Sequence, residues 1–274
     1  MERTRRQPPS PRRLGALAVC AGMLLAGCSG EEQRASQTPP ANGLTPSPSP
    51  TVSIQSPAPD PSASGTTAQP SETEAAPTVG ELYRDTRTSA LAAGSGHAVG
   101  TQTRGGRTLR IDVEGVANGS NQRVAITVPG GGTSEVITEG GRYWLGGDEA
   151  FWVEQTGDAD AGRDMVGKYV EISESDATEL GSFTLRSILT EKFGLAQFAA
   201  LEGVGTPAQR TTLKGKDAYL LTGRDGARLW VATDGSGQLL RAVGPKGAPS
   251  DLTFSGWERA RTWQAPPAGS VVEG

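Results

Sequence analysis

Two stretches of alternating apolar and polar residues constrain the fold more than any other feature of this sequence. The first contains HAVGTQT, TLRIDVEGVA, QRVAITV, SEVITEG and RYWLGG, and the second contains QRTTLKG, DAYLLTG, ARLWVAT, QLLRAVG and SDLTFSGWE. Turn sequences such as Gly105-Gly106, Asn118-Gly119 and Asp225-Gly226 separate these segments. Alternation with a period of two is typical of strands that bury one face, and such turns let successive strands reverse direction tightly. Each stretch therefore predicts an antiparallel meander.

Helical segments are expected around these strands. The segment TVGELYRDTRTSALAAG has helical spacing, DEAFWVEQ can form a short helix, and SFTLRSILTEKFGLAQFAAL again has helical spacing. The segment GKYVEIS is expected to form a short strand or an extended segment. The third helical segment is amphipathic and is expected to break at Gly194. Its apolar face contains Leu185, Ile188, Leu189 and Phe193, continued by Phe198 and Leu201.

The order of these elements is helix, five strands, helices, five strands. It predicts an α+β fold in which a single curved antiparallel sheet has helices packed over its concave face.

Aromatic residues mark the extent of the folded part. Residues 29–79 contain none and are rich in Pro, Ser, Thr and Ala, whereas every aromatic residue lies between Tyr83 and Trp263. A segment of that composition cannot bury enough apolar surface to offset its ordering entropy. We therefore expect a disordered Pro/Ser/Thr-rich linker at residues 28–79 and one folded domain at residues 80–274.

The N-terminus has the pattern of an export signal. Five arginines precede a short apolar run, Leu14 to Ala26, which is too short to span a bilayer as a helix. The run ends in Leu25-Ala26-Gly27-Cys28, which resembles the lipobox of bacterial lipoproteins. That resemblance implies a signal peptide at residues 1–27, cleavage before Cys28, and a diacylglyceryl thioether on Cys28 with acyl chains such as palmitate. It also implies anchoring on the outer face of the plasma membrane. The alternative is an ordinary secretory signal with an incidental cysteine.

Charge and cysteine content exclude several classes of function. The whole chain has 26 Lys and Arg against 30 Asp and Glu, and loss of the signal leaves 21 against 29, a formal charge of −8. An acidic chain argues against binding of nucleic acid and against additional binding to anionic headgroups. Cys20 would leave with the signal, so the mature chain would contain only Cys28 and could form no intramolecular disulfide.

Few residues are suited to catalysis or metal binding, and no cofactor is expected. His97 is the only histidine, and we interpret it as a structural strand residue rather than a catalytic base. Asp158, Asp160 and Asp164 lie close together in sequence, but an EF-hand loop would need Glu where Tyr169 stands. We therefore expect a solvated, flexible loop there, no metal site, and no enzymatic activity.

Longer motifs resemble a known family. GGRYWLGGDEAFW followed by GKYVEIS, and then GKDAYLLTG, ARLWVAT, LLRAVG and LTFSGWE, resemble actinobacterial lipoproteins related to the mycobacterial LppX/LprG family. The resemblance covers about residues 80–270. It implies a LolA/LolB-like unclosed half-barrel, a single curved antiparallel sheet whose inner surface and covering helices enclose an apolar cavity. Relatives in mycobacteria bind acylated glycolipids.

Two functions remain open from the sequence. The first is a membrane-anchored lipoprotein that binds or carries an acylated lipid or glycolipid in an apolar cavity. The second is a non-enzymatic structural or interaction module at the cell surface, in which side chains fill the half-barrel. Candidate cavity residues are large and apolar: Trp144, Phe151, Trp152, Leu185, Ile188, Leu189, Phe193, Phe198, Trp230 and Phe254.

Overall fold

A computed structural model describes residues 76–180 and 183–273 of the chain. Cys28, the signal sequence and nearly all of the Pro/Ser/Thr-rich segment lie outside these residues. Their predicted roles therefore remain predictions.

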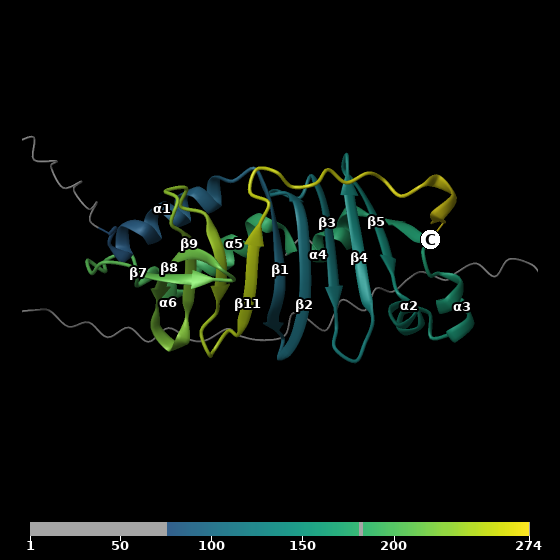
Figure 1. Ribbon diagram of the computed structural model, residues 1–274. Coiled ribbons are helices and arrows are strands. Elements are labelled where there is room, and N and C mark those ends of the chain that lie inside the picture. The colour runs from purple at the N-terminus through teal and green to yellow at the C-terminus, as the bar shows by residue number, and fades with distance from the viewer. Residues whose placement is uncertain (1–75, 181–182, 274) are drawn as a thin grey trace, which may run out of the picture. The chain divides into compact units, whose positions relative to one another are not determined.

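The described residues form six α-helices and twelve strands, and Figure 1 shows their arrangement. The helices are α1 (Val79–Ala92), α2 (Glu149–Thr156), α3 (Ala159–Asp164), α4 (Glu174–Leu180), α5 (Leu185–Gly194) and α6 (Ala196–Ala199). The first six strands are β1 (Ser95–Arg104), β2 (Arg107–Val116), β3 (Asn121–Thr127), β4 (Thr133–Glu139), β5 (Arg142–Gly147) and β6 (Tyr169–Ile172). The others are β7 (Gln209–Leu213), β8 (Lys216–Thr222), β9 (Arg228–Ala232), β10 (Leu239–Val243), β11 (Ser250–Ser255) and β12 (Val271–Val272).

All twelve strands belong to one sheet with the order β12-β6-β5-β4-β3-β2-β1-β11-β10-β9-β8-β7. Neighbouring strands are antiparallel except for β12, which pairs with β6 in parallel. The sheet is not closed into a barrel, because β12 and β7 form its two edges. The predicted α+β class with a single open sheet is confirmed. Strand β12 was not predicted, since a two-residue strand has no detectable period.

The two predicted meanders meet at the centre of this sheet. Strand β1 pairs with β2 on one side and with β11 on the other, so the first strand of one meander lies beside the last strand of the other. The closest approach is at Gly100, where a Cβ atom would lie 1.9 Å from the backbone oxygen of Asp251. Only glycine fits there, and the φ of +153° favours glycine as well.

One face of the sheet, here called the inner face, packs against helices. Val113 of β2, Val124 of β3 and Val136 of β4 are direct cross-strand neighbours on this face, and all three are buried. Helix α5 lies over β1 and β2 and also contacts α1, while α2 packs on β4 and β5 (Figure 1). The opposite face, here called the outer face, is turned toward the viewer in Figure 1.

Two sequence-based expectations need correction or refinement. The segment around Asp158, Asp160 and Asp164 was expected to be a flexible loop, but it forms α3, and the Asp158 side chain caps the helix by accepting hydrogen bonds from two backbone N–H groups. Pro77 and Thr78 were assigned to the linker, yet Pro77 accepts a hydrogen bond from the Ala208 N–H, and Thr78 forms the capping box of α1 with Glu81.

The C-terminal segment runs from β11 across the ends of several strands before it reaches β12 (Figure 1, yellow). Side chains of three successive strands bind its backbone. Glu114 of β2 accepts from the Arg261 N–H at 3.3 Å, and Glu139 of β4 accepts from the Ala265 N–H at 2.7 Å. Between them, the Asn121 amide of β3 both donates to and accepts from the backbone of Trp263, at 2.8 and 2.9 Å.

Candidate functional site

The space between α1, α5, α6 and the sheet holds the largest apolar cluster among the described residues. Six of the ten predicted cavity residues lie together in it. They are Leu185, Ile188, Leu189, Phe193, Phe198 and Phe254, and each is at most 3% exposed. Since such side chains pack at the density of an organic crystal, they fill this space with their own atoms.

Helix α1 closes this cluster on one side. Its Tyr83 is 1% exposed and meets the ring of Phe193 edge to face, with ring centroids 5.9 Å apart. The Tyr83 hydroxyl donates to the backbone oxygen of Phe193 at 3.4 Å, and burial raises the pKa of this phenol. A buried tyrosine needs such a hydrogen-bond partner, so this contact fixes α1 against the end of α5.

Local sequence signals place α5 over the sheet. Thr184 caps its N-terminus by accepting from the Ser187 N–H at 3.0 Å. Two residues after Thr184, the backbone N–H of Arg186 donates to the backbone oxygen of Ala117. The guanidinium of Arg186 donates to the backbone oxygen of Leu91 at 2.6 Å. The helix ends at Gly194, as predicted, and α6 follows after Leu195.

A group of polar residues lies at the C-terminal half of α5, at the edge of the apolar cluster. Lys192 is only 2% exposed, and its ammonium donates to the carboxylate of Glu191 at 3.1 Å. The same carboxylate accepts from Gln102 at 3.2 Å and from Arg104 at 2.7 Å, and both of these residues belong to β1. We call these four residues the Glu191 cluster.

Electrostatics hold the Glu191 cluster together. Burial opposes ionisation of Glu191, but the neighbouring Lys192 and Arg104 outweigh burial and lower the pKa of this carboxyl. Arg104 also stacks on the ring of Phe183, with 4.5 Å from its guanidinium carbon to the ring centroid. The cluster therefore joins the end of α5 to β1 through one ionised carboxylate, and no pattern in the sequence predicted it.

Two buried oxygens near the cluster lack a hydrogen-bond partner among the described residues. They are the amide oxygen of Gln102 and the hydroxyl of Ser250, and these two residues are direct cross-strand neighbours on β1 and β11. A buried polar atom is normally satisfied by protein or by ordered water. Several polar groups therefore lie together at this end of the interior.

The other four predicted cavity residues lie elsewhere. Phe151 and Trp152 of α2 belong to a second, smaller cluster with Val136, Leu145 and Val170, over the β4–β6 end of the inner face. Trp144 and Trp230 lie on the outer face, because Trp144 pairs with Ile137 and Trp230 pairs with Arg241 in the register of that face. Because β5 and β9 lie far apart in the sheet, the ten candidates occupy four separate places.

Arginine side chains bury the two outer-face tryptophans. Arg142 lies over the ring of Trp144, and both Arg228 and Arg241 lie over the ring of Trp230. Guanidinium groups are attracted to aromatic faces, so a tryptophan can be buried on a solvent-facing sheet without helix cover. This explains why the two residues are only 2% and 7% exposed.

A small pocket of about 170 Å³ lies between the end of α1, the β9–β10 connection and the segment after β11. Its wall is formed by Ser89, Ala90, Ala93, Ser236, Gln238, Leu239, Trp257 and Glu258. Sites for drug-sized ligands usually measure about 300–1,000 Å³. This pocket is therefore too small to hold an acylated lipid.

The single histidine lies on the outer face, in β1. Its Nε2 contacts the Asp112 carboxylate at 2.9 Å, and its Nδ1 lies 3.5 Å from the Ser255 hydroxyl. The hydrogen bond with Asp112 raises the pKa of His97 and lowers that of Asp112. A serine nucleophile normally lies within about 2.6–3.2 Å of its base. The three side chains come from adjacent strands, and the Asp112 contact fits the predicted structural role of His97.

Within residues 76–180 and 183–273, no three His, Cys, Asp or Glu side chains are grouped so that they could hold a metal ion. In the same part of the chain, no helix has the length and apolar character needed to cross a membrane.

Comparisons with known proteins place the fold among solved structures. The sequence matches no family model and no curated protein. The structure is similar to that of LprF from Mycobacterium bovis, with 16% identity, a TM-score of 0.46, and coverage of 70% of this chain and 100% of that chain. It is also similar to the Mycobacterium tuberculosis lipoprotein LppX, with 17% identity, a TM-score of 0.36, and coverage of 66% and 94%. LppX, which shares its name with the family that the sequence motifs resemble, is thus among the solved structures to which this chain is similar. Because the identities are low, the ligand is argued below from this chain's own residues.

Proposed function

We propose that this protein is a lipid-anchored extracytoplasmic protein that binds or carries an acylated lipid between α5 and the inner face of the sheet. The anchor would be the diacylglyceryl group on Cys28, at the end of the lipobox-like sequence. Residues 28–75 would act as a stalk that lets the domain reach into its surroundings, and no catalytic step is involved.

One observation carries this proposal. Helix α5, flanked by α1 and α6, covers the apolar centre of an open sheet, and the end of α5 is fixed to β1 by the Glu191 cluster. Displacement of α5 would expose a continuous apolar surface while the backbone hydrogen bonds of the sheet stay intact. Acyl chains could then replace the apolar side chains of α5 with little net change in hydrophobic free energy.

A second candidate function is favoured by the packing of the same interior. Ile188, Leu189 and Phe198 are at most 1% exposed, so side chains fill the space that a ligand would need. If α5 never leaves the sheet, the domain is a surface module whose partner binds elsewhere. The two functions differ in whether α5 opens.

Lipid content and lipid uptake test the first function. The mature chain, residues 28–274 with Cys28→Ser, would be purified from an actinobacterial host, and bound lipid would be extracted and identified by mass spectrometry. We expect near-stoichiometric acylated lipid, and uptake of a fluorescent fatty acid by the delipidated protein.

A pair of variants makes the test specific for α5. Glu191→Gln weakens the attachment of α5 and should accelerate probe uptake several-fold, whereas Glu154→Gln on the exposed surface of α2 should leave uptake unchanged. Absence of co-purified lipid, together with no uptake by any of the three proteins, would reject lipid binding and favour the surface module.

A further inference from the structure

Charge is distributed unevenly along the described part of the chain. Residues 76–202 contain 11 Lys and Arg against 18 Asp and Glu, whereas residues 203–255, which contain β7 to β11, carry 7 against 4. The acidic balance of the whole chain therefore conceals a basic region at one end of the sheet.

Several of these basic side chains converge on one carboxylate of the outer face. Arg241 binds Asp251 through two hydrogen bonds, of 2.7 and 2.5 Å. These bonds lower the pKa of Asp251 against the effect of burial, and the nearby charges of Arg228 and Lys214 lower it further. Lys214 belongs to the turn before β8, so the twist of the sheet brings this edge turn close to β11.

The strand register adds a further cation. Asp251 pairs with Thr101, and Thr101 pairs with Arg110 of β2, so Arg110 shares the outer face with Asp251. Arg110, Lys214 and Arg228 are exposed, and Arg241 is partly exposed. We call these four residues the basic face. Two carboxylates lie beside them, Asp251 and, next to Arg110, Asp112, so the group with both has a formal charge of +2.

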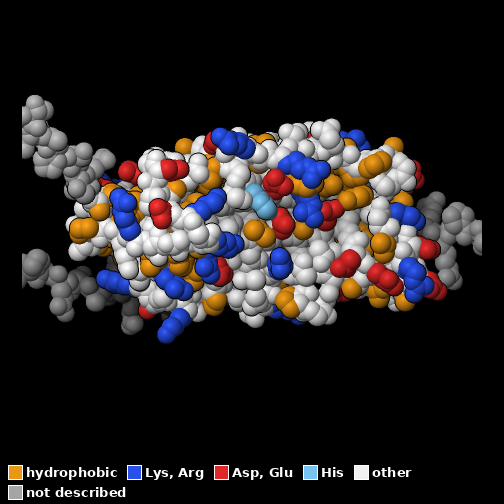
Figure 2. Space-filling view, in the orientation of Figure 1, with side chains coloured by type: hydrophobic (Ala, Val, Ile, Leu, Met, Phe, Trp, Pro, Cys, Tyr) orange, Lys and Arg blue, Asp and Glu red, His pale blue; other side chains and the backbone are white. Residues whose placement is uncertain are grey.

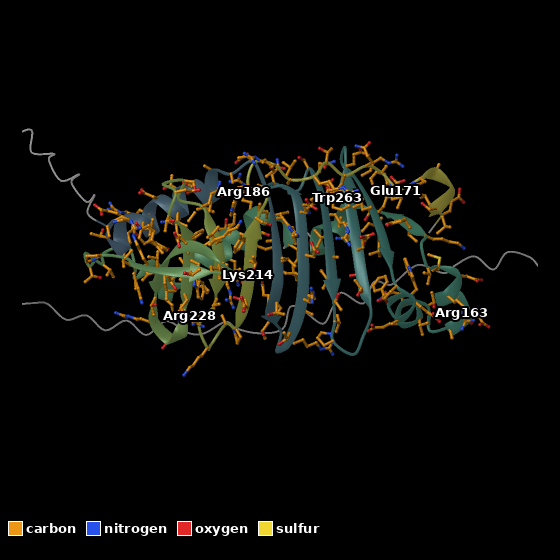
Figure 3. All side chains as sticks on the ribbon, in the orientation of Figure 1. Arg163, Glu171, Arg186, Lys214, Arg228 and Trp263 are labelled. Atoms are coloured by element: carbon orange, nitrogen blue, oxygen red, sulfur yellow. The ribbon has the colours of Figure 1, made fainter. Side chains whose placement is uncertain are left out.

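Stacking keeps these charges at the surface. The guanidinium carbons of Arg228 and Arg241 lie 5.3 and 4.9 Å from the ring centroid of Trp230. An arginine that lies on an aromatic ring loses less side-chain freedom when it binds a phosphate than a free arginine does. Figure 2 shows basic side chains gathered over this end of the outer face, and Figure 3 places Lys214 and Arg228 there.

From this arrangement we propose that the basic face docks the domain on the anionic headgroups of a lipid bilayer. The proposal rests on the proposed function for one point, the anchor that would keep the domain near a membrane. Anionic bilayers attract clusters of Lys and Arg, and planar guanidinium groups bind phosphate oxygens in pairs. Docking through the outer face would leave α1 and α5, which cover the inner face, free to move.

Vesicle binding tests this proposal. The mature chain with Cys28→Ser would be sedimented with vesicles of phosphatidylcholine alone or of phosphatidylcholine with 30% phosphatidylglycerol, at 50 and 300 mM NaCl. We expect binding to the anionic vesicles only, with weaker binding at the higher salt concentration. The double variant Lys214→Glu/Arg228→Glu should reduce binding at least roughly tenfold, given about 1 kcal/mol for each basic residue near an anionic surface.

A control variant changes the total charge by the same amount as Lys214→Glu/Arg228→Glu, but at residues of α1 that are outside the basic face. Arg84→Glu/Arg87→Glu alters two exposed residues of α1 and should reduce binding much less. The proposal would be overturned if both double variants lost vesicle binding equally. It would also be overturned if the protein bound neutral vesicles with an affinity that did not depend on salt concentration. Binding of a soluble polyanion such as heparin without binding of anionic vesicles would also overturn it, in favour of an acidic macromolecular partner.

Uptake of the fluorescent fatty acid separates this proposal from the proposed function. Lys214→Glu/Arg228→Glu should take up the probe normally, because these residues lie outside the interior. If vesicle binding holds while no variant takes up the probe, docking stands and lipid binding in the interior fails.

Discussion

At the scale of single residues, the pair of His97 and Asp112 shows how one hydrogen bond joins two strands electrostatically. The contact of 2.9 Å crosses from β1 to β2 on the outer face, and both side chains are partly exposed. The hydrogen bond raises the pKa of His97 and lowers that of Asp112, so each partner favours the charged form of the other.

These shifts predict a definite pH dependence of stability. The pKa of His97 is higher in the folded protein than in the unfolded chain, where it is about 6.5. The stabilisation that His97 provides is therefore complete below about pH 6.5 and is lost as the pH rises through the pKa of the folded state. The pKa of Asp112 is lower in the folded protein than in the unfolded chain, where it is about 3.9. The stabilisation that Asp112 provides is therefore complete above about pH 3.9 and is lost as the pH falls through the pKa of the folded state. The pair therefore stabilises the protein most between about pH 4 and 6.5.

The variant His97→Gln tests this dependence. Its melting temperature should lie below that of the unmodified chain at pH 5.5, and the difference should shrink by pH 8.5. Ser255→Ala serves as control, since it leaves the contact with Asp112 in place and should show no such trend. A difference that is the same at both pH values would show that the ion pair is not responsible.

At the scale of elements, helix α5 depends on a few polar contacts at each end. Thr184 begins the helix, and Glu191 joins its second half to β1. Lys192 is nearly fully buried beside Glu191, so removal of the carboxylate charge would leave a buried ammonium without its counterion. Such a buried, uncompensated charge is strongly destabilising.

The variant Glu191→Gln should therefore destabilise the domain. We expect a loss of about 1–3 kcal/mol, below the full value for a buried pair because Glu191 is 40% exposed on its side chain. Urea unfolding gives the magnitude, and hydrogen exchange should accelerate most within residues 185–194. Glu154→Gln is the matched control. Unchanged exchange in α5 would mean that apolar packing alone fixes this helix.

At the scale of the whole domain, the C-terminal segment connects parts of the sheet that are far apart in sequence. It begins after β11 near the centre of the sheet and ends as β12 beside β6 at one edge. Asn121 holds its middle through two hydrogen bonds to the Trp263 backbone, and the ring of Trp263 stacks with Arg123 and Arg261.

The variant Asn121→Ala should release this segment. Two hydrogen bonds of this kind contribute about 1–3 kcal/mol together. We expect faster cleavage by trypsin at Arg259 and Arg261, followed by mass spectrometry of the fragments. Asn118→Ala, in the nearby β2–β3 turn, is the control because the Asn118 side chain, within the described part of the chain, accepts from the Ser120 N–H of its own turn and from no residue of the C-terminal segment. Equal cleavage rates in the two variants would show that the stacked tryptophan holds the segment without Asn121.

The sequence predicted the strands well and the site only in part, for a physical reason visible in β5. The segment RYWLGG places Trp144 and Leu145 side by side in sequence and therefore on opposite faces of the sheet. Alternation shows that two faces differ but does not show which one the helices cover. Since Arg142 can bury Trp144 as effectively as a helix would, hydrophobicity alone assigned this tryptophan to the wrong face.

By itself, the sequence determined the strand-rich α+β fold, the antiparallel strands, the amphipathic character of α5 and its end at Gly194, because periodicity and glycine act locally along the chain. Only the tertiary structure decided which side chains meet. It joined Gln102 and Arg104 to Glu191, placed Trp230 on the outer face, and gathered Lys214, Arg228 and Arg241 around Asp251. Those contacts depend on strand order, register and twist, which no local pattern of residues encodes.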